Sequence, residues 1–566
     1  MKKLPITKRL FLLVLIAGLV APFAVARAAQ DPTYVRTVNG QIRGQLNDSR
    51  QTIEWLGIPY AKPPVGELRW RAPQDPDNWN GTRETTSFSP ASMQFGGGRA
   101  IGSEDCLYLN VFRPNSDDKN LPVFMFLHGG NNQTGSASAM DGSLMAAGLN
   151  AVVITINTRL NALGFLNIDA IKTGDPIEDS GNFGLLDIAK ALDWVQYNIT
   201  AFGGNQNNVT VSGFSSGGRN VLCMTISPLF KDKFHKAIIV CAGQTTTDPQ
   251  VGAEIATRAL ASLVVEDGLR ATEAQAVEWI NSATPEVRAY LMQLSADRFA
   301  PLMAAALIRM SVFPHLFADG VVIPREGFDV LSTGNYNKMP MIFTSGSNEF
   351  TSFLNRDPHF SNLDLTVNDP QRSREYVFAD TYGSLLFGYF NSENNAASYS
   401  SVDGQAPVYA SRIFWGKDPA IVGQRASMLI GGGHGMDYYL MNEQEPAAYA
   451  VSYQIFSAAN KPGRDALGKD IRSYFANFLR TGNPNGPGLT QWNPWSNQEG
   501  TPKMLMLDAD LTRTRISMTS DHTVEEDVFR QLLSDNSLSE DRRSFLVENV
   551  LNGRFFSKNL DAFWGK

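Results

Sequence analysis

The segment VTVSGFSSGG, residues 209–218, decides the fold of this 566-residue chain. Its β-branched start is typical of a strand, and the small residues that follow predict an immediate turn into a helix. Gly213 to Gly217 fit the G-x-S-x-G nucleophile elbow, in which a sharp strand-to-helix turn exposes the serine hydroxyl. The flanking glycines leave room for the crowded backbone around Ser215. A lone match also fits a Ser-rich loop, but the strand-like residues before it favour the elbow.

Apolar runs on both sides of this segment extend the pattern to the whole chain. A helical repeat over residues 184–199 precedes the elbow strand. Buried-type strands are predicted at residues 122–127, 151–156, 236–241 and 340–344. Continuous apolar strands that alternate with helices predict a mostly parallel sheet with helices on both faces, the α/β class. Ligands of such folds bind beyond the carboxyl ends of the strands.

Residues 29–566 show no repeat and no linker, so we expect one domain. Within it, residues 246–335 contain amphipathic stretches without intervening strands, which predicts a helical insertion over the active-site side of the sheet. Residues 355–405 are polar and Asn-rich and are expected to be loops. Further predictions are a strand at residues 407–415, a helix at 465–480 and the start of a helical tail at 524–533.

Residues 1–28 have the pattern of a secretory signal peptide. They carry five basic and no acidic residues, an apolar run from residue 10 to 26, and the A-x-A sequence of residues 26–28. Cleavage near Ala28 and export to the periplasm or beyond are therefore expected. The alternative is an uncleaved membrane anchor, which the short run and its Pro22 disfavour.

Charge and composition exclude several functions. The formal net charge is −7, and without the first 28 residues the remaining 44 basic and 56 acidic residues give −12. An acidic body argues against nucleic-acid binding, which requires a basic face. No other run is long and apolar enough for stable membrane insertion. The three cysteines, Cys106, Cys223 and Cys241, form no Cys-x-x-Cys motif, and no metal site or cofactor is expected.

A serine nucleophile requires a base, and six histidines are available. In α/β hydrolases the order along the chain is serine, acid, histidine, so the base must follow Ser215. His434 lies in the glycine-rich segment of residues 431–437, after a predicted strand, and is the best candidate. Glu349, which follows the strand at 340–344, is the candidate acid; Asp357 and Asp319 are weaker alternatives.

Donors for an oxyanion are expected in two places. The first is the backbone N–H of Ser216, directly after the nucleophile. The second is the loop that follows the strand at 122–127, where Gly130 and Asn131 stand in the sequence HGGN.

Several longer segments carry a family resemblance. They are GIPYAKPPVGELR at 57–69, SEDCLYLNV at 103–111, HGG at 128–130, NFGLLD at 182–187, FGG at 202–204, NVT at 208–210 with the elbow, HG at 434–435 and TGNP at 481–484. With them the chain resembles the type-B carboxylesterase/lipase family, which also contains the cholinesterases. The resemblance implies the α/β-hydrolase fold. It also implies a triad of Ser215, Glu349 and His434, and an oxyanion hole formed by Gly130, Asn131 and Ser216.

The departures from that family point to specificity. Asn131 replaces a usual third glycine, and Asn tolerates the positive φ that a donor there requires. Phe214 replaces the usual Glu before the serine, which removes a carboxylate from the substrate pocket and argues against cationic alcohols. Asp437 also replaces a usual Glu, and the segment before Glu349 is two residues shorter than the common form. The family's cysteine partner of Cys106 is missing, with Ser92 in that region, so the early disulfide is expected to be absent.

These observations predict an exported serine carboxylic-ester hydrolase that acts on a small-molecule ester and needs no cofactor. Three alternatives remain open. The chain could hydrolyse amides or carbamates, could be a specialist for a bulky ester such as a polyester or natural product, or could be a non-catalytic adhesion-type relative. A complete triad argues against the last. The oligomeric state has no signature in the sequence.

Overall fold

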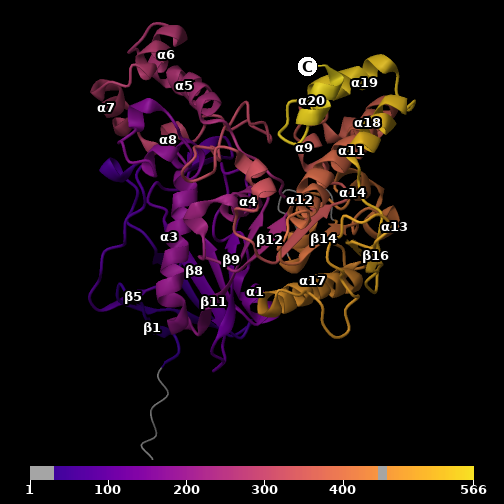
Figure 1. Cartoon of the computed structure of the whole chain (residues 1–566), viewed down its shortest axis with the longest axis horizontal. Helices are drawn as coiled ribbons and strands as arrows, with labels where there is room; N and C mark the ends of the chain where they lie inside the picture. The colour runs from indigo at the N-terminus through magenta and orange to yellow at the C-terminus, as the bar shows by residue number, and fades with distance from the viewer. Residues whose placement is uncertain (1–30, 444–454, 566) are drawn as a thin grey trace, which may run out of the picture.

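A computed structural model describes residues 31–443 and 455–565, so the predicted signal peptide lies outside the described residues. An 11-stranded sheet forms the centre of the described chain (Figure 1). Its strands, from one edge to the other, are β16 (Ser517–Thr519), β15 (Met504–Leu507), β14 (Val408–Ile413), β13 (Met341–Gly346), β12 (Lys236–Val240), β11 (Gly204–Phe214), β9 (Leu121–Leu127), β10 (Val152–Ile156), β8 (Tyr108–Pro114), β4 (Thr52–Pro59) and β3 (Gln45–Asn47).

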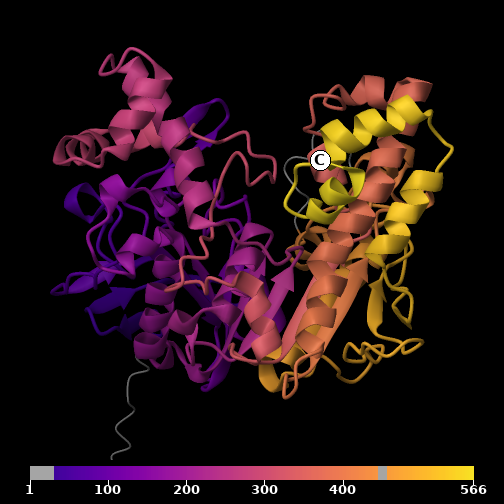
Figure 2. The same ribbon diagram turned by 45° about the horizontal axis from the view of Figure 1, so that its top comes forward.

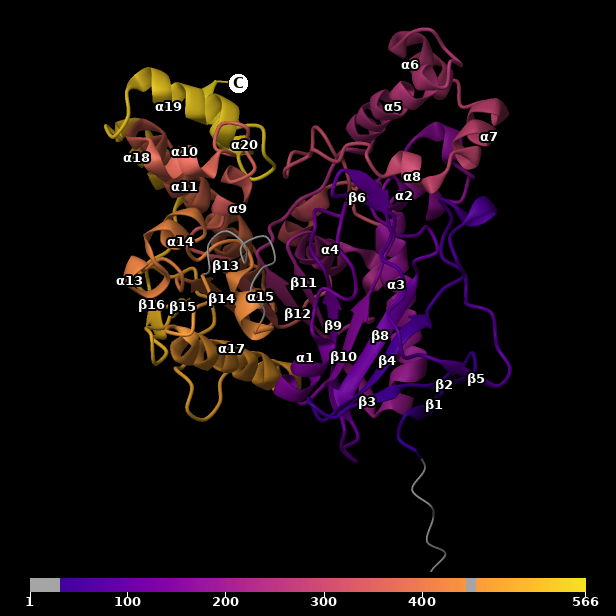
Figure 3. The same ribbon diagram turned by 180° about the vertical axis from the view of Figure 1, so that it is seen from behind.

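The strands from β15 to β10 pair in parallel, whereas β16 at one edge and β8, β4 and β3 at the other pair antiparallel. The predicted mostly parallel α/β sheet is therefore confirmed. Figure 3 shows the antiparallel edge from behind. Two small sheets are separate from this central sheet. One consists of β1 (Tyr34–Arg36), β2 (Gln41–Arg43) and β5 (Thr82–Glu84), and the other of β6 (Gln94–Gly96) and β7 (Arg99–Ile101).

Helices cover both faces of the central sheet, as the buried strands require. The helices of the described residues, which include those that rise above the carboxyl ends of the strands, are α1 (Gly142–Leu149), α2 (Asn161–Gly164), α3 (Phe183–Asn198), α4 (Ser216–Ile226), α5 (Pro249–Glu266), α6 (Glu273–Asn281), α7 (Pro285–Gln293), α8 (Ala296–Phe299), α9 (Thr351–Leu354), α10 (Leu363–Asn368), α11 (Pro370–Gly388), α12 (Asn394–Ser400), α13 (Pro419–Val422), α14 (Gln424–Leu429), α15 (Met436–Met441), α17 (Lys461–Thr481), α18 (Glu525–Ser534), α19 (Glu540–Leu546) and α20 (Lys558–Trp564). No helix within the described ranges combines the length and the apolar character needed to cross a bilayer.

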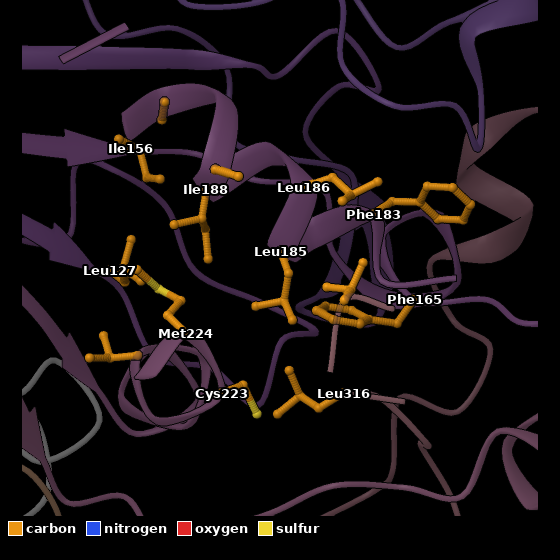
Figure 4. Packing of buried hydrophobic residues seen from close by; sticks show 14 of the residues in the cluster. Leu127, Ile156, Phe165, Phe183, Leu185, Leu186, Ile188, Cys223, Met224 and Leu316 are labelled. Atoms are coloured by element: carbon orange, nitrogen blue, oxygen red, sulfur yellow. The ribbon is translucent and has the colours of Figure 1, made fainter. Parts of the chain in front are cut away.

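The core between the sheet and its helices is close-packed (Figure 4). Leu127 and Ile156 at the ends of two neighbouring strands face Ile188 of α3 and Met224 of α4. All four side chains are almost completely buried. The apolar repeat of α3 therefore fixes this helix against the carboxyl ends of β9 and β10, close to the predicted oxyanion loop.

Two groups of helices rise above the carboxyl ends of the strands (Figure 2). One group is α5 to α8, which lies within the segment for which an insertion was predicted. The other is α18 to α20 at the end of the chain, packed with α11. Together they border the edge of the sheet at which α/β proteins bind ligands.

The expectation of loops over residues 355–405 was wrong. Helices α10, α11 and α12 and a π-helical turn at Tyr389–Glu393 occupy most of this segment. Helix α11 has no continuous apolar face, because Glu375, Asp380 and Ser384 are among its buried residues. Their hydrogen bonds and ion pairs replace the apolar contacts that a periodicity argument detects.

A buried ion pair joins the loop after β10 to α3. The guanidinium of Arg159 donates to Asp187, with 2.7 Å between Nη2 and Oδ1, and the Arg159 backbone N–H donates to the same carboxylate at 2.9 Å. Both side chains are almost fully buried. Each charge therefore depends on the other for compensation.

We predict that Asp187→Asn lowers the free energy of unfolding by about 3–5 kcal/mol, because it leaves the Arg159 guanidinium buried without its counter-charge. The control is Asp169→Asn, which breaks an exposed pair with Lys172 and should have little effect. Urea titration of both variants tests this. A midpoint for Asp187→Asn equal to that of the wild type would contradict it.

Candidate active site

The elbow places Ser215 in a strained conformation at the junction of β11 and α4. Its φ of 55° and ψ of −119° lie outside the regions that L-residues favour. The Ser215 N–H donates to the carbonyl of Val240 on the neighbouring strand at 2.8 Å. A Cβ at Gly213 would lie 2.2 Å from the backbone of Gly217, and one at Gly217 would lie 2.3 Å from the carbonyl of Leu127. Only glycine therefore fits at positions 213 and 217, two residues before and two residues after the serine.

His434 and Glu349 form a buried hydrogen-bonded pair. The imidazole Nδ1 lies 2.6 Å from Glu349 Oε2 and donates to it, since an ionised carboxylate can only accept. The backbone N–H of Gly346 donates to the other carboxylate oxygen, and Asn391 Nδ2 donates to Oε2 at 3.3 Å. His434 Nε2 is buried and has no hydrogen-bond partner among the described residues. The pair leaves this nitrogen as a free acceptor.

Three phenylalanines surround the His434 ring. The centroids of Phe214, Phe353 and Phe387 lie 5.1, 5.4 and 5.7 Å from that of the imidazole. Phe214 also stacks on Tyr438, with 5.2 Å between the centroids and an interplanar angle of 1°. The aromatic rings fix the orientation of the imidazole and exclude water from its faces.

The predicted oxyanion loop has the conformation that backbone donors require. Gly130 and Asn131 have φ values of 110° and 57°, so Asn takes the left-handed conformation that its sequence position suggested. Within the described residues neither backbone N–H donates a hydrogen bond. Ser216 opens α4, where the first N–H groups have no intrahelical acceptor.

The side chain of Asn131 is held from behind by Arg219. The guanidinium Nη2 donates to Asn131 Oδ1 at 2.6 Å, and Nη1 donates to His315 Nε2 at 2.8 Å. His315 carries its proton on Nδ1, which lies 3.0 Å from the carbonyl of Phe313. Burial, followed by the charge of Arg219, holds the pKa of His315 well below its usual value. Burial also lowers the pKa of Arg219 to about 9, and no carboxylate pairs with it among the described residues.

These groups meet at one cavity of about 480 Å³. Its walls combine the predicted catalytic residues with apolar side chains from the insertion and from the segment after Glu349. The lining residues are Phe95, Gly130, Asn131, Gln133, Thr134, Phe214, Ser215, Ala300, Ala304, Leu307, Ile308, Ser352, Phe353, Arg356, His434 and Tyr439. A concave pocket in which polar groups converge among apolar side chains is the usual form of a small-molecule site.

The two alternative acids lie elsewhere. Asp357 pairs with Arg554, and Asp319 accepts three backbone N–H groups from Val321, Val322 and Ile323. Neither contacts His434, whereas Glu349 does.

Sequence reasoning missed Asn391 and Phe387, which contact the pair of Glu349 and His434. Both lie in the segment that was expected to be loops. Arg219 was also missed, although a lone arginine within an otherwise small and apolar stretch after the elbow could have indicated it.

The cysteines take no part in a disulfide. All three are free and buried. Burial raises the pKa of Cys106 to about 12, and a hydrogen bond with Ser92 lowers it only in part. Ser92 thus lies beside Cys106. Because Cys106 is free, it does not form the early disulfide, as the sequence predicted.

The fold and the elbow define an α/β hydrolase. Residues 31–396 match the Carboxylesterase family, so the chain belongs to this family, and it is a carboxylic-ester hydrolase. It is 30% identical to liver carboxylesterase 1 of Oryctolagus cuniculus, over 83% of this chain and 89% of that protein. It is 29% identical to carboxylesterase 1D of Rattus norvegicus, over 84% and 89%. The solved structure of the carboxylesterase EST55 of Geobacillus stearothermophilus matches with a TM-score of 0.65 and 27% identity, covering 86% of this chain and 97% of that one.

A second carboxyl group lies close to the pair. Asp437 accepts hydrogen bonds from the Thr344 hydroxyl and from the Tyr438 N–H. Burial raises its pKa to about 6; these bonds lower it, and the charge of Glu349 adds to the increase. This carboxyl therefore takes up a proton at a higher pH in the folded than in the unfolded protein.

We predict that Asp437→Asn flattens the pH dependence of stability between pH 4 and pH 6.5. The pKa is higher in the folded than in the unfolded chain, so the wild type loses stability as pH rises through this window, by up to about 3 kcal/mol. The amide cannot ionise and avoids this loss. Urea titrations at pH 4.5 and 7 test it, with exposed Asp403→Asn as the control. Equal pH dependence in wild type and Asp437→Asn would contradict the prediction.

Proposed function

We propose that this carboxylesterase works through an acyl-enzyme on Ser215, with His434 as general base and acid and Glu349 as the orienting carboxylate. The backbone N–H groups of Gly130, Asn131 and Ser216 would bind the oxyanion. One observation carries the proposal: a serine with positive φ shares a cavity with an imidazole whose Nδ1 is bound to a buried carboxylate and whose Nε2 is free.

In the first half-reaction the Ser215 oxygen attacks the ester carbonyl carbon while His434 Nε2 takes the hydroxyl proton. The tetrahedral intermediate then collapses. Its bond to the alcohol oxygen breaks, and His434 returns the proton to the leaving alkoxide. The products of this step are the free alcohol and an acyl group bound to Ser215.

In the second half-reaction water attacks the acyl carbon and gives its proton to His434. The bond between the acyl carbon and the Ser215 oxygen breaks, and the serine recovers the proton. The acid is released and the enzyme returns to its starting state. Glu349 accepts the hydrogen bond from the Nδ1–H of His434 throughout, and its charge stabilises the imidazolium that forms in each step.

Ser215→Ala should reduce kcat for p-nitrophenyl butyrate at least about 1000-fold, because no other group can form the acyl-enzyme. The Cβ of alanine already exists in serine, so the fold should be retained. Thermal unfolding provides the control. Activity equal to that of the wild type would refute the assignment of the nucleophile.

The acid is tested by a matched pair of isosteric changes. Glu349→Gln should lower kcat by a factor on the order of 10³–10⁴, because the amide no longer fixes the imidazole tautomer. Asp357→Asn removes a carboxylate that contacts Arg554 rather than His434, so its kcat should stay far above that of Glu349→Gln. The assignment fails if Asp357→Asn loses the greater activity while both variants remain folded.

We also propose that the chain is made by a bacterium and exported, with residues 1–28 as its signal peptide. The basic start, the apolar run and the A-x-A sequence support this. N-terminal sequencing of protein recovered from the periplasm or medium of a bacterial host should find a chain that begins near Ala29. Recovery of uncleaved chain from the membrane fraction alone would contradict it.

A further inference from the structure

The described lining of the catalytic cavity carries positive charge and no negative charge. Apart from His434, Arg356 is the one ionisable side chain with a charge at neutral pH in the cavity lining that the structure describes, and this lining contains no carboxylate. In the family pattern a Glu precedes the nucleophile, whereas Phe214 stands there in this chain. A ligand in the cavity therefore meets apolar and neutral polar side chains and one fixed positive charge.

Arg356 is available to a ligand. It lies just after α9 and is exposed, while Phe353 of the same segment forms the wall beside His434. Its backbone N–H donates to the carbonyl of Phe353, which fixes the turn. Its guanidinium makes no hydrogen bond and no ion pair with any described residue. An arginine without a counter-charge at the edge of a pocket is suited to bind a carboxylate through two parallel hydrogen bonds.

The nearest carboxylate in the sequence does not neutralise Arg356. Asp357 is buried, and its Oδ2 lies 3.3 Å from Nη2 of the buried Arg554. Arg309 also acts on this region, because its charge lowers the pKa of Arg554. Asp357 is thus engaged by Arg554 and does not pair with Arg356.

A second guanidinium lies behind a wall of the cavity, where it holds the lining residue Asn131. Arg219 is buried behind Asn131, and no carboxylate pairs with it among the described residues. Its other partner, His315, is neutral because its Nε2 accepts a hydrogen bond from Arg219. The low dielectric of the surrounding core strengthens the positive potential that this charge produces in the cavity.

We propose that this esterase selects esters that carry an additional free carboxylate, which Arg356 binds. Such substrates are half-esters of dicarboxylic acids, or esters whose alcohol part bears a carboxylate. The hydrolysed ester group lies at Ser215 and the free carboxylate at the rim of the cavity. The proposal rests on the proposed acyl-enzyme function and assigns its substrate class.

Two pairs of matched substrates test it. In the first pair the acyl part differs: p-nitrophenyl hydrogen suberate carries a free carboxylate, and its methyl ester does not. In the second pair the alcohol part differs: 4-carboxyphenyl butyrate is compared with the neutral 4-carbamoylphenyl butyrate. For the wild type, kcat/KM should favour the anionic member of at least one pair by about fivefold to tenfold. This ratio should fall as ionic strength rises.

A set of variants distinguishes binding of the carboxylate by Arg356 from an effect of the net charge of the protein. Arg356→Gln should bring the ratio close to one, Arg356→Lys should retain part of it, and Arg356→Glu should favour the neutral ester. Arg36→Gln removes an equal charge at an exposed position on β1, which does not line the cavity, and should leave the ratio unchanged. A preference found only in the suberate pair assigns the carboxylate to the acyl side, and one found only in the other pair assigns it to the alcohol side.

The proposal is overturned if the wild type prefers the neutral member of both pairs, or if its ratio is the same in Arg356→Gln. It also fails if Arg36→Gln lowers the ratio as much as Arg356→Gln does. Ser215→Ala distinguishes these results from failure of the proposed function. If that variant still hydrolyses the neutral esters, the acyl-enzyme assignment is wrong; if it does not, only the substrate class is at fault.

Discussion

The conformation of one residue, Ser215, constrains most of the described structure. Its positive φ is maintained because its N–H is bound to Val240 while the backbone beside it closes against the end of β9. The register that aligns Gly213 with Leu127 therefore also places the glycine loop after β9 beside the serine. A slip of one residue in this pairing would separate the proposed nucleophile from the proposed oxyanion donors.

The pair of His434 and Glu349 depends on a different part of the chain. Glu349 has hydrogen bonds from Gly346 and Asn391 in addition to that from His434, so its buried charge is compensated on several sides. Asn391 belongs to the π-helical turn between α11 and α12, and Phe387 on α11 stacks on the imidazole. The helical segment after the acid thus orients both members of the pair.

The sequence predicted the parts of the fold that depend on apolar periodicity and on strained turns. The strands β9, β10 and β12 are buried throughout and mostly apolar, and glycine is required at positions 213 and 217 beside the elbow, so local patterns carry this information. Helix α11 was missed because polar side chains interrupt its buried face, and whether Glu375 or Asp380 finds a partner depends on residues distant in sequence. Contacts such as that of Arg219 with Asn131 are likewise decided by packing and have no periodic signature.

The replacement of a carboxylate by Phe214 has two separate consequences. Its ring stacks on Tyr438 and contacts the His434 imidazole in a tilted arrangement, so it stabilises the orientation of the base through contacts that a glutamate could not make. It also removes a negative charge from a cavity that has Arg356 at its rim and Arg219 behind its wall. Packing alone would be satisfied by any large apolar residue. The loss of negative charge gains importance because two guanidinium groups without carboxylate partners among the described residues act on the same cavity. The aromatic ring and the arginines therefore act together on the charge of the cavity, and this charge is the basis of the proposed preference for anionic esters.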